Sequence, residues 1–311
     1  MLLSVVVPCY NEEAGVERLV SVLSASLPDI SDDFEVILVD DGSGDATAER
    51  LRSVAQEDSR FRFVSFSRNF GKEAAMLAGM QKAQGDAVAI IDADLQHPPE
   101  LLAKMIPFLS QGYDQVVARR TRTGDALLRT IASRAYYRVM NGLSDVPLED
   151  GVGDFRVLSR KAVNALLMLR EYNRFSKGLF SWIGFPTATV DYENVAREAG
   201  ESKWGLRSLF NYGVDGIVSF NSRPLRIAIY LGLLIVAVGL IYAVWIGVGF
   251  LAGGIAVPGY ITTIWAVVLF GGFEMIMLGV IGEYLGRIYL EVKARPHFIV
   301  RDQTPPNIAD R

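Results

Sequence analysis

The chain has 311 residues, 50% of them apolar and 21% charged, and a mean hydropathy of +0.25; this length allows about two globular units, or one unit and a membrane-embedded part, and the composition excludes intrinsic disorder. The net charge of −4 and the pI near 5.4 argue against a nucleic-acid-binding protein. One cysteine and two histidines exclude disulfide frameworks and multi-cysteine metal sites, so that any metal site would consist of carboxylates and water, which favours Mg²⁺ or Mn²⁺ over Zn²⁺.

The first part of the chain, up to about residue 195, alternates short β-branched segments with helical patterns. This alternation predicts an α/β fold with a mostly parallel, Rossmann-like sheet and helices on its faces. The N-terminal segment has no basic region and its apolar run ends at Pro8, so we do not expect a signal peptide. Five strands are predicted, at Leu3–Val7, Glu35–Val39, Arg62–Phe66, Ala87–Ile91 and Gln115–Ala118.

Polar clusters follow four of these predicted strands. Ligands of open α/β sheets bind at the carboxyl ends of the strands, so we expect the clusters to lie along one rim and to form the functional site. The sequence lacks the glycine-rich patterns of dinucleotide-binding and P-loop proteins, which excludes both classes. The clusters are Pro8–Glu12, Asp40–Ser43, Ser67–Asn69 together with Gly71 and Lys72, and Asp92–Gln96.

The fourth cluster contains two aspartates separated by one residue. Asp92 and Asp94 can hold a hard divalent cation, with Gln96 as a neutral oxygen ligand, and such a cation would neutralise a diphosphate. Alternatively, these acidic residues cap the helix that starts near Pro98. The Asp40–Ser43 cluster has a similar alternative, because its sequence is ordinary turn chemistry. The shared rim favours a ligand site for both clusters.

Two further helical patterns follow this region. Between residues 124 and 140 the apolar positions have helical spacing, and Arg129 and Ser133 lie four residues apart on a shared face. Residues 206–218 form one apolar stripe directly after Trp204, which predicts an amphipathic helix in the membrane interface. An ordinary core helix is the alternative for this second segment.

The excess of apolar residues is concentrated near the C-terminus. Ile227–Ala252 is apolar throughout, and Ile261–Ile281 contains a single charged residue, Glu274. As a helix, each stretch is long enough to cross a hydrocarbon core of about 30 Å, so a transmembrane hairpin is predicted, with two buried core helices as the alternative. Lys and Arg flank the two stretches but are absent from the loop between them, which predicts that both termini and the N-terminal domain face the cytoplasm.

Two features of the second stretch concern helix contacts. Glu274 is costly inside an apolar span, and neither stretch has a Lys, Arg or His to pair with it. We expect Glu274 to support helix packing or assembly and to take no part in the chemistry. Gly282 and Gly286 form a Gly-x-x-x-Gly pattern that permits close helix contact, and we therefore expect a homo-oligomer.

Several motifs give the chain a resemblance to a known family. Val5–Glu12, Val39–Thr47 and Asp92–Glu100 are similar to motifs of the family 2 glycosyltransferases of GT-A fold. Within that family the chain resembles the polyprenyl-phosphate glycosyltransferases, which include dolichyl-phosphate mannose synthases and bacterial bactoprenol glucosyltransferases. Ser67–Ala75, Arg197–Trp204 and Gly282–Pro296 match the two-span bacterial branch. The resemblance implies a nucleotide-sugar donor, Mg²⁺ or Mn²⁺, and a lipid phosphate acceptor.

The resemblance also implies roles for individual residues. The metal would be held by Asp92, Asp94 and Gln96, and Asp94 would act in catalysis through it. The candidate nucleotide-sugar-binding residues are Pro8, Tyr10, Glu12, Val39, Asp41, Lys72, Asp92, Ala93, Arg197 and Lys203, and the candidate lipid-phosphate-binding residues are Arg120, Arg129 and Ser133. Asp154 is the candidate general base, although a strand-edge carboxylate paired with Arg156 explains it equally well. The segment with Arg197 and Lys203 is expected to be a lid over the site or a solvated loop.

These expectations describe a metal-dependent hexosyltransferase that loads polyprenyl (undecaprenyl) phosphate, with inversion, at the cytoplasmic face of the inner membrane. UDP-glucose is the favoured donor, and GDP-mannose or another UDP-sugar is the alternative. A non-catalytic membrane assembly or transport subunit is the alternative from another class, whereas a processive polysaccharide synthase would need a Gln-x-x-Arg-Trp motif that the chain lacks. The expected regions are a cytoplasmic GT-A catalytic domain at 1–203, an interfacial helix at 204–222, a transmembrane hairpin at 223–288 and a cytoplasmic tail at 289–311.

Overall fold

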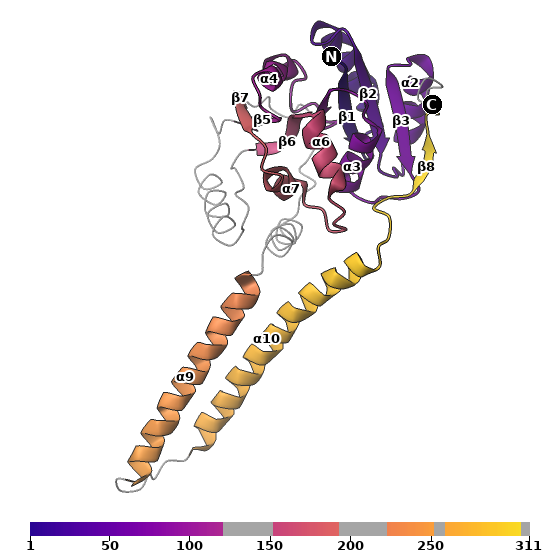
Figure 1. Cartoon of the computed structure of the whole chain (residues 1–311). Helices are drawn as coiled ribbons and strands as arrows, with labels where there is room; N and C mark the ends of the chain where they lie inside the picture. Colours follow the sequence, from indigo (N-terminus) through magenta and orange to yellow (C-terminus); the bar gives the residue numbers. More distant parts are fainter. Residues whose placement is uncertain (121–151, 193–222, 252–258, 306–311) are drawn as a thin grey trace.

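A computed structural model of the chain describes residues 1–120, 152–192, 223–251 and 259–305 (Figure 1). Four of the predicted site residues lie outside these ranges: Arg129, Ser133, Arg197 and Lys203. The predicted interfacial helix also lies outside them. The structure therefore tests the sheet rim and the hairpin helices.

An eight-stranded sheet forms the centre of the N-terminal part, with the strand order β7-β5-β6-β4-β1-β2-β3-β8. Its strands are β1 (Leu3–Cys9), β2 (Phe34–Asp40), β3 (Phe61–Phe66), β4 (Ala87–Ile90), β5 (Gln115–Arg120), β6 (Val152–Ser159), β7 (Thr187–Tyr192) and β8 (Val300–Gln303). All five predicted strands form. Strands β1 to β4 are mutually parallel, β5 pairs in parallel with β7, and β6 and β8 are antiparallel to their neighbours. The mostly parallel α/β sheet is thus confirmed.

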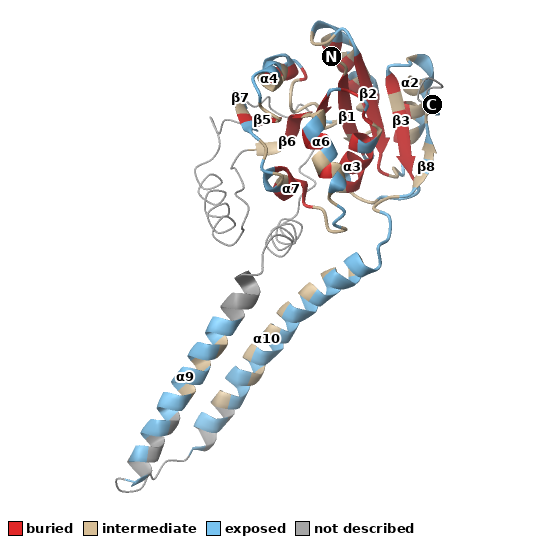
Figure 2. Ribbon diagram, viewed as in Figure 1, coloured by how far each residue is buried: buried red, intermediate tan, exposed pale blue. Residues whose placement is uncertain are grey.

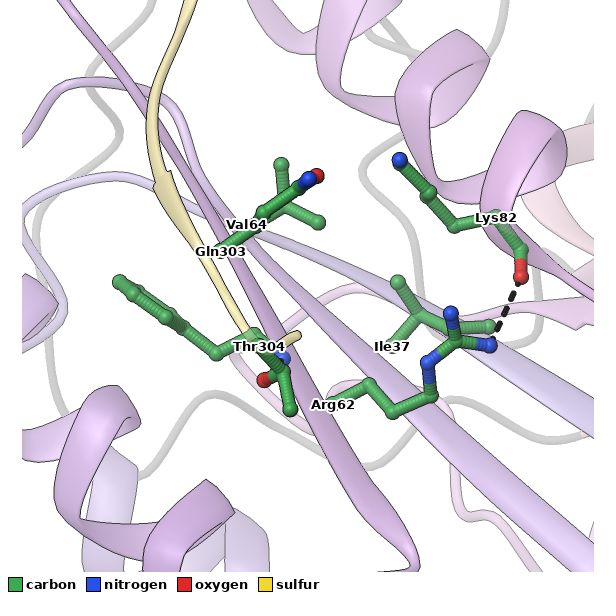
Figure 3. Close-up of a pocket in the computed structure, with 7 residues that line it drawn as sticks. Ile37, Arg62, Val64, Lys82, Gln303 and Thr304 are labelled. Atoms are coloured by element: carbon green, nitrogen blue, oxygen red, sulfur yellow. Dashed lines mark hydrogen bonds between the residues drawn. The ribbon is translucent and has the colours of Figure 1, made fainter. Parts of the chain in front are cut away.

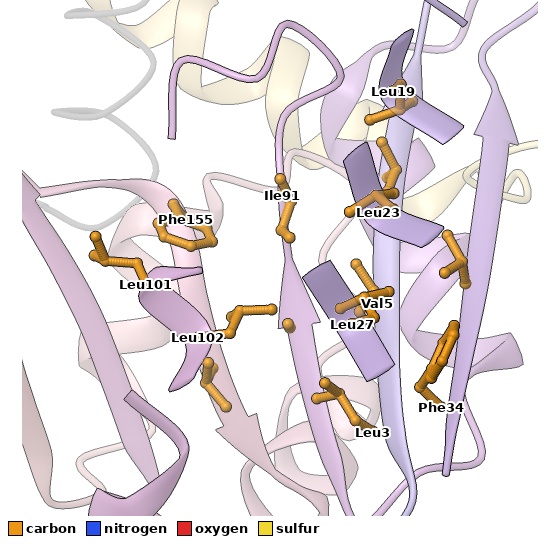
Figure 4. Close-up of a cluster of buried hydrophobic side chains, with 14 of the residues drawn as sticks. Leu3, Val5, Leu19, Leu23, Leu27, Phe34, Ile91, Leu101, Leu102 and Phe155 are labelled. Atoms are coloured by element: carbon orange, nitrogen blue, oxygen red, sulfur yellow. The ribbon is translucent and has the colours of Figure 1, made fainter. Parts of the chain in front are cut away.

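Helices cover both faces of the sheet, which explains why its central strands are apolar on both sides. One face packs against α1 (Val16–Ser26), α2 (Thr47–Glu57) and α4 (Leu101–Ser110), and Figure 4 shows part of this core. The other face packs against α3 (Lys72–Lys82), α6 (Arg160–Met168) and α7 (Ser176–Trp182). A short 3-10 turn, η1 (Leu27–Asp29), follows α1.

Helix α3 lies unusually close to the sheet. A Cβ atom on Gly79 would lie 2.1 Å from the Val6 side chain, so only glycine permits this approach. The residues of α3 from Ala74 to Met80 are all buried. Because α3 is fixed against β1 in this way, its first residue, Lys72, has a defined position at the sheet rim.

Two long helices extend away from the sheet and contact each other (Figure 1). They are α9 (Arg223–Leu251) and α10 (Tyr260–Val292), so both lie where the hairpin was predicted and are separated at the predicted break. Their side chains are mostly exposed, in contrast to the core of the sheet (Figure 2). Among the described residues, one segment, Ala266–Val292, is long and apolar enough to cross a bilayer. A crossing by both helices stays a prediction.

The chain returns from α10 to the sheet. Strand β8 pairs antiparallel with β3, Phe298 stacks on Phe66 with ring centroids 4.7 Å apart, and Asp302 lies 2.6 Å from the Arg52 guanidinium. At the end of α10, Glu291 Oε1 accepts a hydrogen bond of 2.7 Å from the backbone N–H of Tyr172. The expected C-terminal tail is therefore partly a strand of the central sheet, which the sequence analysis did not predict.

A small cavity of about 60 Å³ lies beside β8 (Figure 3). Arg62 is among its lining residues and donates a hydrogen bond to the carbonyl of Lys82. Ligand pockets for small molecules usually measure about 300 Å³ or more. The cavity is too small for a nucleotide sugar.

Candidate active site

The strand directions bring the predicted clusters to one rim. Strands β1 to β4 run in the same direction, so their carboxyl ends lie along one edge of the sheet. Strand β6 runs opposite to β4, which places its first residues, including Asp154, beside the loop that follows β4. Beyond β6 in the strand order, Arg120 at the end of β5 pairs with Tyr192 at the end of β7. The expected common rim is confirmed.

Lys72 lies at the centre of this rim and joins two carboxylates. Its Nζ atom is 2.5 Å from Oδ1 of Asp92 and 2.6 Å from Oδ2 of Asp154. Burial alone would lower the pKa of Lys72, but the two carboxylates outweigh this effect and hold the pKa above its ordinary value. Lys72 is therefore a permanent cation between two segments that lie far apart in the sequence.

Asp154 has a different environment from the one expected for a strand-edge carboxylate. Strand β6 is an interior strand between β4 and β5, so the strand-edge interpretation is wrong. Burial raises the pKa of Asp154, but Lys72, Lys177 and Arg156 together hold it below the ordinary value. Arg156 donates to the carbonyl of Gly153 at 3.0 Å, and the ion pair of Asp154 is with Lys72. Asp154 is thus ionised at neutral pH.

The loop after β4 carries the predicted metal ligands. Asp92 is half-buried and Asp94 is exposed, and the backbone N–H of Gln96 donates to Asp94 at 3.1 Å. Helix α4 begins only at Leu101, so neither aspartate caps it, contrary to the alternative. In the part of the chain that the structure describes, no three Asp, Glu, His or Cys side chains are grouped as a metal site.

This donor set still fits a hard divalent cation. Mg²⁺ commonly binds one or two carboxylates and completes its shell with waters and the phosphates of a substrate. Asp92, Asp94 and the Gln96 amide offer such an incomplete set of oxygen ligands at an open rim. The chemistry of these side chains therefore suits a cation that binds together with a diphosphate.

Asp41 fixes the loop that precedes Lys72. Its carboxylate accepts hydrogen bonds from the backbone N–H groups of Phe70 (2.7 Å) and Gly71 (2.9 Å). Burial raises the pKa of Asp41, and these amides offset part of the effect. Gly42 has a φ of +64°, and a Cβ atom there would lie 2.2 Å from the backbone of Arg68, so the Asp-Asp-Gly-Ser turn requires glycine. A carboxylate has further lone pairs, so Asp41 can still accept from a nucleoside.

Asp40 in this cluster and Asp45 just after it hold turns of the backbone, as the turn alternative predicted. Asp40 accepts from the Ser43 backbone N–H at 3.1 Å and from the Ser65 hydroxyl at 2.6 Å. Asp45 accepts from the backbone N–H of Thr47, the first residue of α2, at 3.0 Å. These two carboxylates hold the backbone, and Asp45 also accepts a hydrogen bond of 3.3 Å from the backbone N–H of Glu13 in the loop after β1.

The loop after β1 forms one wall of an open hollow. Pro8 and Val39 are paired across β1 and β2, Tyr10 is exposed, and the backbone N–H of Glu12 donates to the Thr47 hydroxyl at 2.9 Å. The hollow has a volume of about 390 Å³ and is lined by Asn11, Glu12, Glu13, Ala14, Gly15, Asp45 and Arg50. This volume is in the range of small-molecule sites.

The comparison with known proteins identifies the family. The profile described as glycosyl transferase family 2 matches residues 4–167, and a profile described as the GtrB C-terminal hairpin matches residues 223–288. The chain belongs to glycosyl transferase family 2. It is therefore a glycosyltransferase whose catalytic sheet has the GT-A arrangement, as the sequence motifs suggested.

Relatives match over almost the full length. CsbB of Bacillus subtilis (strain 168), which carries a provisional glycosyltransferase name, is 51% identical over 98% of this chain and 93% of its own. The uncharacterized glycosyltransferase sll0501 of Synechocystis sp. (strain ATCC 27184 / PCC 6803 / Kazusa) is 42% identical over 96% and 95%. The bactoprenol glucosyl transferase of Shigella phage SfII is 38% identical over 97% and 98%.

Solved structures resemble the chain more distantly. Mannosyl-3-phosphoglycerate synthase from Rubrobacter xylanophilus aligns with 73% of this chain and 74% of its own, with a TM-score of 0.48 and 20% identity. Membership in glycosyl transferase family 2 rests on the sequence matches.

Two contacts at the rim of this glycosyltransferase were missed by the sequence analysis. Tyr192 Oη lies 2.6 Å from His97 Nδ1, and half-buried Glu73 accepts hydrogen bonds from the backbone N–H and the hydroxyl of Ser176 at the start of α7. His97 lies in the Asp92–Glu100 motif, but no sequence pattern predicted Tyr192 as its partner. Ser176 and Tyr192 belong to elements that were not predicted.

Proposed function

We propose that the chain transfers glucose from UDP-glucose to polyprenyl phosphate, with inversion at the anomeric carbon, at the cytoplasmic face of the membrane. The names of several relatives at 37–38% identity, which refer to bactoprenol glucosyl transfer, support the sugar and the acceptor. The observation that carries the proposal is the Lys72–Asp92–Asp154 cluster. It gathers one ammonium and two carboxylate groups where a diphosphate leaving group would need stabilisation.

We propose Mg²⁺ or Mn²⁺ as the cofactor, held by Asp92, Asp94 and Gln96. When bound, the cation would act as a Lewis acid that stabilises the leaving diphosphate. Lys72 lies beside Asp92 and would contact the same phosphates once they enter. Pro8, Tyr10, Glu12, Val39, Asp41 and Ala93 are the proposed contacts of the nucleotide sugar on the described rim, and Arg197 and Lys203 are proposed from the sequence.

The transfer itself needs little proton chemistry. An oxygen of the acceptor phosphate would form the new bond to the anomeric carbon, while the bond from this carbon to the diphosphate breaks and the electron pair leaves with the diphosphate. A phosphate monoester is already ionised at neutral pH, so no strong base is required. Ionised Asp154, held by Lys72, would then orient the reacting groups and serve as a base only if a monoanionic acceptor enters.

We propose that the acceptor approaches from the side of the hairpin. Arg120 ends β5 on the same rim, and Arg129 and Ser133 follow it in the sequence. The proposed division is a catalytic domain at 1–203, an interfacial helix at 204–222, a two-span hairpin at 223–288 and a cytoplasmic tail at 289–311. Both hairpin ends would face the cytoplasm, and the Gly-x-x-x-Gly pattern of Gly282 and Gly286 supports a homo-oligomer through α10.

A transfer assay with the full-length protein tests this proposal. Vesicles with undecaprenyl phosphate receive the protein and either radiolabelled UDP-glucose, another labelled UDP-sugar or labelled GDP-mannose. We expect glucose label in the extracted lipid and an equal release of UDP, both abolished by EDTA and restored by Mg²⁺ or Mn²⁺. Transfer from another donor alone would correct the sugar, whereas the absence of any lipid-dependent nucleotide release would support a non-catalytic subunit.

A separate variant tests the proposed acceptor site. Arg129→Ala removes a proposed charge-assisted contact with the lipid phosphate, so the KM for the lipid should rise by about tenfold or more while UDP binding is unchanged. A loss of UDP affinity with normal lipid kinetics would assign Arg129 to the donor instead.

A further inference from the structure

His97 connects three strands at the rim. Its Nδ1 atom lies 2.6 Å from the hydroxyl of Tyr192, and its ring stacks on Phe155 with centroids 5.2 Å apart and planes within 7°. The Tyr192 ring meets the imidazole edge-on, at 5.3 Å and 76°. A Cβ atom on Gly153 would lie 3.9 Å from His97 Nε2. The imidazole is therefore enclosed by the start of β6 and the end of β7.

Each neighbour of His97 belongs to a proposed functional segment. His97 directly follows Gln96, and Phe155 directly follows Asp154. Tyr192 is the last residue of β7 and pairs with Arg120 in the sheet. One side chain thus joins the proposed metal loop, the proposed Asp154 segment and the strand that leads in sequence toward Arg197.

The backbone conformation of the proposed metal loop, Asp92–Gln96, needs support from residues outside the loop. Leu95 has a φ of +53°, a conformation that side chains other than glycine rarely adopt. The backbone hydrogen bond within the loop, from Leu95 N–H to the Asp92 carbonyl, is long at 3.4 Å, whereas Gln96 N–H donates to the Asp94 side chain at an ordinary 3.1 Å. A strained backbone persists when its surroundings hold it in place. Tyr192, only 6% exposed, belongs to a buried hydrophobic cluster and can provide this anchor.

We infer that His97 is a positioning residue, which, through Tyr192 and Phe155, holds the Asp92–Gln96 loop in the geometry that binds the metal and the diphosphate. The inference rests on the proposed function for the identity of that ligand.

Two conservative variants test the inference. Tyr192→Phe removes the hydroxyl and keeps the buried ring, and His97→Phe keeps an aromatic ring that can stack on Phe155 and removes the nitrogens. Tyr113→Phe is the matched control, because Tyr113 packs against Phe108 beyond α4. The readouts are amide hydrogen exchange of residues 92–97 in metal-free protein, the Mn²⁺ concentration at half-saturation of UDP binding, and the KM and kcat of sugar transfer.

Faster exchange in this loop and a rise of about tenfold in half-saturating Mn²⁺ are expected for both variants, with the core amides of β1 still protected. The double variant should show little more than either single change, because both remove the same hydrogen bond. Unchanged exchange and Mn²⁺ dependence in Tyr192→Phe would overturn the inference. If the variants exchange faster in this loop but the wild type shows no Mn²⁺-dependent UDP binding, the proposed function is refuted. The anchoring role of His97 then still stands.

Discussion

Lys72 decides the charge balance at the scale of single residues. Asp92 lies in the loop after β4 and Asp154 in β6, and their carboxylates would repel each other without the ammonium group between them. The same ammonium lies beside Asp92, where the diphosphate is proposed to bind. Lys72 therefore pairs with two carboxylates in the free protein and would contact the diphosphate in the donor complex.

Lys72→Met should lower kcat/KM for UDP-glucose by about 10- to 100-fold, because charge-assisted contacts are worth about 1.5–3 kcal/mol. Lys72→Arg keeps the charge in a planar group of different reach and should lie between wild type and Lys72→Met. Steady-state kinetics at varied donor concentration provide the measurement. Equal activity of Lys72→Met and wild type would show that the cation has only a structural role.

Asp94 provides a complementary test, because its carboxylate is exposed. Asp94→Asn should remove most turnover and weaken Mn²⁺-dependent UDP binding, while circular dichroism and thermal unfolding stay near wild type. EDTA should reduce wild-type activity to a similar level. An Asp94→Asn protein that is fully active in the presence of chelator would exclude the metal assignment.

At the scale of elements, α10 has an unusual carboxylate. Glu274 is exposed on this helix, inside the segment that is long and apolar enough to cross a bilayer. Such a group needs a polar partner in a membrane, and a second copy or the lipid headgroup region can supply one. Its position on an exposed face agrees with a role in assembly.

Glu274→Gln keeps the shape and the hydrogen-bonding capacity of the side chain and removes the ionisable group. We expect turnover within about twofold of wild type, and an unchanged elution volume in detergent gel filtration. Glu274→Leu, which also removes the hydrogen bonds, should shift the oligomer toward smaller species. A large fall in turnover with the assembly intact would place Glu274 in the reaction instead.

The elements that the sequence predicted have a local pattern, whereas the ones it missed depend on distant partners. The five predicted strands are short apolar runs followed by polar turns, and that local pattern was sufficient to locate the Asp92 and Asp41 clusters on one rim. Strand β8 has four residues, two of them charged, and depends on partners such as Arg52, 250 positions earlier in the chain. The contact of Lys72 with Asp154 spans 82 positions. Local patterns carry no information about such pairings.

At the scale of the whole molecule, the hairpin is an insertion in one folded unit. The catalytic sheet receives its last strand only after the chain has passed through α9 and α10, and β8 is held there by Phe298, Asp302 and the ladder with β3. Glu291 adds a contact between α10 and the segment before α7. The hairpin is therefore joined to the sheet by a short, ordered connection.

This short connection has a kinetic consequence. An enzyme on a long flexible tether samples a large volume, whereas a rigidly mounted one meets only substrates that diffuse within the same two-dimensional layer. If α9 and α10 are embedded as proposed, collisions with the lipid acceptor depend on its mole fraction in the bilayer rather than on its amount per volume of suspension. Dilution with inert phospholipid would then slow the reaction even when the total acceptor is constant, and the water-soluble donor would be unaffected by this dilution.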